Sequence, residues 1–166
     1  MSPRASDNVI EPVGANGSAI DFLDWVATAE IHGSSLDSQD YAAIQSVAAL
    51  YGHVIDSRRW DLLQLVYVSE GIYDGSQTGS ARHSGLAAIV HYLSTSLQPS
   101  AHHATNVLLT SEVDGQVRGV SKYFVVRRDM SIASGFYRDL WRRTSSGWRL
   151  EVRSSHQLST AAKQVV

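Results

Sequence analysis

The sequence predicts an α+β domain in which three N-terminal helices pack on a curved, mainly antiparallel sheet. Apolar residues recur at helical spacing in the first part of the chain, whereas from about residue 101 they alternate with polar residues, as in half-buried strands. Asp114-Gly115 and Ser146-Gly147 separate alternating stretches and are typical of hairpin turns. Helices laid over the concave face of such a sheet leave space between the two layers, so we expect an enclosed pocket.

The composition is that of one globular domain. The chain has 166 residues, 43% of them hydrophobic, and a chain of this length buries about two thirds of its unfolded surface. A net charge of -2 without long charge runs argues against nucleic acid or membrane partners. The absence of cysteine excludes disulfides, thiolate metal sites and cysteine nucleophiles. We expect a cytoplasmic protein that binds a small molecule or another protein.

Both ends of the chain are predicted to lie outside the folded domain. Residues 1–18 hold two of the three prolines and many small polar residues, a composition that favours a flexible arm. The domain is assigned to residues 19–160, and residues 161–166 form a C-terminal tail. A short apolar pattern at 20–32 predicts a helix that caps the domain or meets a partner subunit.

The longest helix is predicted at 39–56. Asp37 or Ser38 can cap its first turn, and an apolar stripe recurs at helical spacing along it. A second, short helix rich in leucine is predicted at 60–67.

A short strand is predicted at 70–75, followed by a polar loop at 75–84. Ser84 is the expected N-cap of the third helix, 85–97, which Pro99 ends because proline cannot continue a helix. The main sheet is then built from four strands, predicted at 101–112, 116–128, 133–144 and 147–157.

The first of these four strands carries two adjacent histidines. Because alternate side chains of a strand point to opposite faces, His102 and Asn106 share one face and His103 lies on the other. One histidine can therefore face inward. Two side chains that point apart cannot easily bind one metal ion, so no metal site is expected.

Five short motifs together resemble the SnoaL-like branch of the nuclear transport factor 2-like superfamily. Members of this superfamily share an α+β cone and include scytalone dehydratase, bile-acid dehydratase, ketosteroid isomerase and polyketide cyclases. The resemblance covers about residues 38–157 and implies a cone fold, no cofactor, and a homodimer formed through the outer face of the sheet. It is carried by Tyr51-x4-Asp56-Ser57-x2-Trp60-Asp61, Gly71-Ile72-Tyr73-Asp74, His102-His103-x-Thr105-Asn106, Gly135-x-Tyr137-x-Asp139 and Gly147-Trp148-Arg149-x4-Arg153.

The same resemblance implies roles for individual residues. Asp56 lies where scytalone dehydratase has a catalytic aspartate, and His102 matches the pocket histidine of the family. Tyr51 and Arg153 are similar in position to a tyrosine and a late arginine of the bile-acid dehydratases. Scytalone dehydratase has a second pocket histidine where this sequence has Ser121, so a mechanism that needs two histidines is not expected here.

The resemblance implies acid–base chemistry on a hydrophobic, oxygenated small molecule of polyketide, steroid or aromatic type, and these residues suit such chemistry. An imidazole can act as base or acid near neutral pH, and a carboxylate such as Asp56 can orient it. A tyrosine can donate a hydrogen bond to a developing enolate oxygen. We therefore expect a cofactor-independent dehydratase, isomerase or cyclase. Its expected catalytic residues are Asp56, His102 and Tyr51, and its expected substrate-binding residues are Tyr73, Asp74, Asn106 and Arg153.

A second resemblance supports a different class of function. The β subunits of aromatic-ring dioxygenases also have the cone fold. Residues 125–129 and 139–143 of this chain resemble sequence runs found in those subunits. In that role the protein would be a non-catalytic ligand-binding or assembly subunit. The presence of both Asp56 and His102 favours an enzyme.

Overall fold

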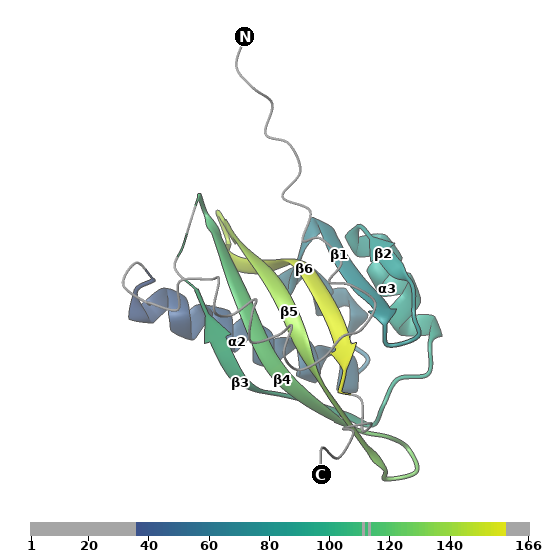
Figure 1. Ribbon diagram of the computed structural model, residues 1–166. Helices are drawn as coiled ribbons and strands as arrows, with labels where there is room; N and C mark the ends of the chain where they lie inside the picture. Colours follow the sequence, from purple (N-terminus) through teal and green to yellow (C-terminus); the bar gives the residue numbers. More distant parts are fainter. Residues whose placement is uncertain (1–35, 111, 113, 159–166) are drawn as a thin grey trace, which may run out of the picture.

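The computed structural model describes residues 36–110, 112 and 114–158, and it places helices against one curved six-stranded sheet (Figure 1). The strand order is β2-β1-β6-β5-β4-β3. β1 pairs with β6 in parallel, whereas the other neighbouring strands are antiparallel, which confirms the α+β class. In chain order the elements are α2 (Ser38–Asp56), the 3-10 helix η1 (Trp60–Leu65), β1 (Tyr67–Gln77), β2 (Arg82–Ser84), α3 (Leu86–Thr95), β3 (Ala101–Leu109), β4 (Gln116–Val126), β5 (Ile132–Thr144) and β6 (Gly147–Gln157).

Helix α2 lies across one face of the sheet, which we call the inner face, and packs against β3 and β6 (Figure 1). Asp37, one of the two predicted caps, is the N-cap of this helix. Its carboxylate accepts a hydrogen bond from the backbone N–H of Asp40 at 2.8 Å. One stripe of the helix is buried in the core. This stripe contains Ile44, Ala48, Tyr51, Val54 and Ile55.

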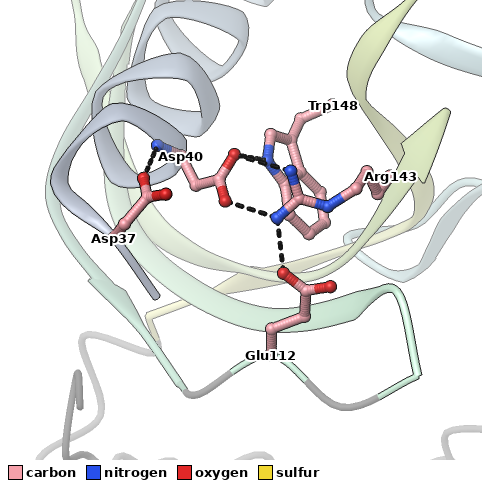
Figure 2. A network of polar contacts seen from close by, with 5 residues as sticks. All are labelled: Asp37, Asp40, Glu112, Arg143 and Trp148. Carbon is pink, nitrogen blue, oxygen red and sulfur yellow. Dashed lines mark hydrogen bonds and ion pairs between the residues drawn. The ribbon is translucent and has the colours of Figure 1, made fainter. Parts of the chain in front are cut away.

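The first turn of α2 is also tied to the sheet by its second aspartate (Figure 2). Asp40 accepts hydrogen bonds from the Arg143 guanidinium of β5 and from the Trp148 indole N–H of β6, the latter at 2.8 Å. These bonds lower the pKa of Asp40, Arg143 contributing most and Trp148 next. The helix start is therefore fixed by a cap and by two strands.

Replacing Asp37 by alanine is expected to destabilise the fold by about 1 kcal/mol, the usual cost of losing an N-cap. The cause is that the N–H of Asp40 would lose its acceptor while the helix remained packed. Urea unfolding monitored by circular dichroism measures this change. Asp37→Asn is the matched control, since asparagine also caps well; equal stability of Asp37→Ala and wild type would contradict the expectation.

The three predicted helices are present, but they do not all precede the sheet. The segment predicted at 60–67 forms the 3-10 helix η1, and strands β1 and β2 come before α3. The predicted cap Ser84 is wrong: Ser84 pairs with Ile72 inside the sheet, and the cap position is Gly85 at φ 86° without a side-chain cap. A positive φ suits glycine, so the backbone itself turns from strand to helix here. The predicted helix at 20–32, the arm at 1–18 and the tail at 161–166 lie outside the described residues.

Strand β1 is longer than predicted, and it changes the architecture of the sheet. The predicted strand 70–75 extends over Tyr67–Gln77, and part of the predicted loop 75–84 forms the paired strand β2. The parallel pairing of β1 with β6 joins segments about 80 residues apart and places Tyr73 beside Arg153. The four later strands lie where they were predicted, although β3 and β4 end earlier.

The outer face of the sheet carries aromatic and cationic side chains. Phe136 stacks on His156 at 4.7 Å between ring centroids, and the Arg138 guanidinium lies 5.7 Å from the Phe136 ring. Burial, together with the charge of Arg138, lowers the pKa of His156 to about 4. A homodimer through this face remains a prediction.

Candidate active site

The end of α2 and the start of β3 bring Asp56 and His102 into direct contact. Oδ1 of Asp56 lies 2.6 Å from Nδ1 of His102, and Oδ2 accepts the backbone N–H of His102 at 3.0 Å. Both carboxylate oxygens of Asp56 thus bond to His102, one to its backbone and one to its ring, which fixes the orientation of the imidazole. The side chain of His102 is 10% exposed and that of Asp56 27%. The adjacent His103 is exposed and stacks on Phe124 at 4.4 Å, as expected for the outward histidine.

A glycine allows the helix to approach the strand this closely. A Cβ atom at Gly52 would lie 2.9 Å from the carbonyl oxygen of His102, so only glycine fits without displacement. Gly52 is one turn before Asp56, so both residues lie on the side of α2 that meets β3. The close contact of backbones is what places the carboxylate beside the ring.

The environment keeps the imidazole neutral. Burial is the main cause that lowers the pKa of His102 below its ordinary value, and the charges of Arg58 and Arg153 act in the same direction. The hydrogen bond and negative charge of Asp56 oppose this shift. A neutral ring whose Nδ1–H donates to the carboxylate carries its lone pair on Nε2, so Nε2 can act as a base.

Tyr51 connects this pair to a buried arginine. The Tyr51 ring meets the His102 ring edge-on at 6.5 Å, and the Arg153 guanidinium carbon lies 4.2 Å from the centroid of Tyr51 and 4.1 Å from that of Tyr137. Tyr51 is 4% exposed, and burial is the largest cause that raises its pKa well above the ordinary value. The Tyr51 hydroxyl therefore stays protonated and can donate a hydrogen bond.

Arg153 is fully buried and is held by a carboxylate that sequence reasoning did not select. Nε and Nη2 of Arg153 donate to the two oxygens of Asp139 at 2.9 and 2.8 Å. Burial acts to lower the pKa of Arg153, but the charge and hydrogen bonds of Asp139 outweigh it and hold this pKa above the ordinary value. The alternation in Gly135-x-Tyr137-x-Asp139 places Tyr137 and Asp139 on one face, and this signal could have identified them.

Other candidate residues are distributed over both faces of the sheet. Ser121 is buried on the inner face, opposite Tyr137 in the sheet register. Tyr73 is also buried and stacks on Tyr92 at 5.5 Å. Asp74 lies on the opposite face of β1 from Tyr73, where its Oδ2 is 4.0 Å from Nη1 of Arg82. The structure therefore does not bring Asp74 to the Asp56–His102 pair.

Asn106 is also placed away from this pair. Its side chain is exposed, and its φ of 52° lies in the left-handed region at an irregularity of β3 between Thr105 and Leu108. The irregularity breaks the alternation on which the shared face of His102 and Asn106 depended.

Two negative observations concern only the described part of the chain. Among those residues, no group of three or more His, Asp or Glu side chains is arranged to hold a metal ion. None of the described helices is long and apolar enough to cross a membrane.

Comparisons with known proteins point to one family. The sequence profile of a family described as a SnoaL-like domain matches residues 37–154. No curated protein matches the chain.

Solved structures of the same fold are distant in sequence. A proposed aromatic ring hydroxylase from Novosphingobium aromaticivorans is 22% identical, with a TM-score of 0.66, over 75% of this chain and 93% of that one. A proposed scytalone dehydratase from the same organism is 16% identical, with a TM-score of 0.60, over 72% and 84%. The β subunit of a proposed aromatic-ring-hydroxylating dioxygenase, also from that organism, is 17% identical, with a TM-score of 0.55, over 71% and 88%. At these identities the likeness shows the fold.

Proposed function

Because the chain belongs to the SnoaL-like domain family, we propose that it is a cofactor-independent dehydratase, isomerase or cyclase that uses general acid–base catalysis on a hydrophobic, oxygenated small molecule. The observation that carries the proposal is the Asp56–His102 contact, in which a partly buried carboxylate orients a neutral imidazole. Fold alone would not support an activity, since one fold hosts many functions.

The first chemical step is removal of a proton beside a carbonyl group. Nε2 of His102 takes the proton, the C–H electron pair forms a new C=C bond, and the carbonyl π electrons move onto oxygen to give an enolate. Asp56 stabilises the resulting imidazolium through Nδ1. In a dehydration, the imidazolium returns its proton to a β-hydroxyl group; the enolate oxygen pair re-forms C=O, the enolate C=C pair becomes the Cα=Cβ bond, and the Cβ–O pair leaves with water. In an isomerisation of an unsaturated ketone, the dienolate takes the proton at another carbon while C=O re-forms and the remaining C=C bond shifts.

Buried donors around the pair support the enolate. Tyr51 and Tyr73 have protonated hydroxyls, since burial raises the pKa of both. Arg153 carries a positive charge on the inner face and suits a carbonyl or enolate oxygen. Asp74 and Asn106 are not proposed as donors or substrate-binding residues. Asp74 lies on the opposite face of β1 from Tyr73, and the Asn106 side chain is exposed.

Deuterium exchange tests this proposal without knowledge of the natural substrate. The protein is mixed with the neutral bicyclic ketone α-tetralone in D2O, and loss of the α-proton signal is followed by NMR. We expect exchange faster than in buffer containing an equal concentration of free imidazole, because the bound ketone is held against an oriented base. Exchange no faster than this control would contradict the proposal.

The exchange rate is expected to rise with pH and level off below the ordinary pKa of histidine, about 6.5. Asp56→Asn removes the two interactions that raise the pKa of His102, so the acid limb should move to lower pH. The plateau should fall by about 10- to 100-fold, by analogy with the loss of a partner that orients a metal-bound histidine. The measurement is kcat/KM for exchange between pH 4.5 and 8; Asp61→Asn, at an exposed ion pair, is the control. An acid limb that moves upward would contradict the assignment.

The alternative is a non-catalytic assembly subunit, which we consider because one solved structure of the same fold is the β subunit of a proposed dioxygenase. In that case wild-type protein would show only background exchange and would form a stable complex with a larger catalytic subunit. Size-exclusion chromatography with light scattering distinguishes such a complex from the homodimer that we propose to form through the outer sheet face.

A further inference from the structure

An open groove of about 400 Å³ lies between the segment that follows α3 and the turn that joins β4 to β5 (Figure 1). This volume is in the usual range for small-ligand sites. None of the residues proposed for acid–base catalysis lines the groove, so that function does not account for it. The lining consists of Leu97, Gln98, Pro99, Arg127, Arg128 and Asp129.

Backbone hydrogen bonds fix both walls of the groove. On one side, the N–H of Ser100 donates to the carbonyl oxygen of Val126 at 2.8 Å, where β3 begins to pair with β4. On the other side, the N–H of Arg127 donates to the carbonyl oxygen of Ser131 at 2.8 Å. Oδ1 of Asp129 accepts the backbone N–H of Ser131 at 3.0 Å. The groove is therefore preformed, which lowers the entropic cost of binding a ligand there.

The most exposed large apolar side chains of the described residues lie at this groove. Leu97 in its wall is 78% exposed, Met130 in the turn is 75% exposed, and Ile132 just after the turn is 65% exposed. The other exposed large apolar side chains in the described part of the chain are at most 45% exposed. Exposed apolar side chains that gather in one place indicate a surface that a ligand or partner covers.

Two arginines of the groove are available to an anion. Among the described residues, Arg128 makes no hydrogen bond or ion pair, and the Arg127 guanidinium donates to a serine hydroxyl of the turn at 3.4 Å. Asp129 is the one acidic residue of the lining, so the lining has one excess positive charge. Behind the wall, Arg58 donates to the backbone of Pro99 at 3.4 Å, and the carboxylate two residues before it offsets its charge.

We propose that this groove binds an aliphatic carboxylate, with the carboxylate group against Arg127 and Arg128 and the hydrocarbon chain against Leu97. The planar fork of a guanidinium matches the two oxygens of a carboxylate, and a monoanion balances the excess charge of the lining. The six lining residues include no aromatic side chain, so nothing in the lining favours a stacked ring over an aliphatic chain. This binding site goes beyond the proposed acid–base function and does not depend on it.

The test compares octanoate with two ligands of the same chain length, neutral 1-octanol and cationic octylammonium. Isothermal titration calorimetry at pH 7.5 and low salt measures the dissociation constants. We expect octanoate to bind wild-type protein about fivefold more tightly than 1-octanol, the upper range for an exposed ion pair of good geometry. Octylammonium should bind most weakly. Concentrated salt should reduce the preference for octanoate, because it screens exposed charges.

Arg128→Gln should weaken octanoate binding about fivefold and leave 1-octanol binding unchanged, because only the contact between charges is lost. The matched control is Arg118→Gln, which removes an exposed arginine near the other end of β4 and should leave both dissociation constants unchanged. Leu97→Ala should weaken the binding of octanoate and of 1-octanol about threefold each, since both chains lose apolar contact.

Asp129→Asn should tighten octanoate binding, which a purely structural role of Asp129 does not predict. The substitution removes the negative charge of the lining, and the asparagine oxygen can still accept the N–H of Ser131. The side chains replaced in all four variants are exposed, so we expect melting temperatures close to that of wild type.

The proposal is overturned if wild-type protein binds octanoate and 1-octanol equally well. It is also overturned if Arg128→Gln and Leu97→Ala bind octanoate as wild type does, because the ligand then lies elsewhere. An equal loss of affinity in Arg118→Gln and Arg128→Gln shows only a general attraction to the charged surface, and it likewise overturns the groove. Exchange of the α-proton of α-tetralone tests the acid–base function separately, so each proposal can fail while the other holds.

Discussion

Replacing His102 by alanine is expected to slow α-proton exchange about 10²- to 10⁴-fold, the usual contribution of a general base. The physical reason is that Nε2 of His102 is the basic atom of the Asp56–His102 pair, held by the contact of Nδ1 with Asp56 at 2.6 Å. Asp56 is a poor replacement, because a carboxylate is ordinarily a much weaker base than an imidazole and Oδ2 stays bonded to the backbone N–H of residue 102. The affinity for α-tetralone should change little, since the buried donors Tyr51, Tyr73 and Arg153 remain.

The adjacent histidine provides a matched control for this experiment. His103 is exposed and lies on the opposite face of β3, so His103→Ala removes the same side chain from the same strand without touching the pair. Exchange by His103→Ala should equal that of wild type. Exchange by a folded His102→Ala variant within threefold of wild type would contradict the catalytic assignment, and circular dichroism verifies the fold.

Replacing Asp139 by alanine is expected to give the largest loss of stability, about 3–5 kcal/mol, which is typical of breaking a buried ion pair. The reason is that Arg153 has no exposed surface and would retain a buried charge without its two carboxylate bonds. Urea unfolding measures the change. Much of the cost arises from the charge that is left behind rather than from the pair itself.

A double variant separates these two contributions. Asp139→Ala combined with Arg153→Met removes both charges, so it should be more stable than Asp139→Ala alone. Asp61→Ala breaks the exposed Arg59–Asp61 pair and should change stability little, since solvent screens such pairs. If Asp139→Ala unfolds at the same urea concentration as Asp61→Ala, Asp139 and Arg153 do not form the ion pair in solution.

Local patterns in the sequence were sufficient to predict most of the elements. Apolar spacing predicted α2, and strand alternation with Gly-containing turns predicted the four later strands, because these signals depend on neighbours within a few residues. Strand parity also predicted that one histidine faces inward and the other outward. Tyr51 and Asp56 are five residues apart, which puts them about 140° apart around the helix axis, so their spacing did not predict that both lie near the His102 ring. The contact arises because Gly52 lets β3 approach α2 closely.

The sequence by itself determined the α+β class and the family, together with Asp56 and His102 as a candidate pair. Only the tertiary structure decided that the two residues meet and that Asp139 and Arg153 form a buried ion pair. It also decided that Tyr67 lies beside Tyr51, because the parallel pairing of β1 with β6 joins distant segments. Such pairings leave no periodic signal, since they depend on how the whole sheet buries its inner face. Asn106 shows the converse: alternation placed it beside His102, but one irregularity in β3 turned it to solvent.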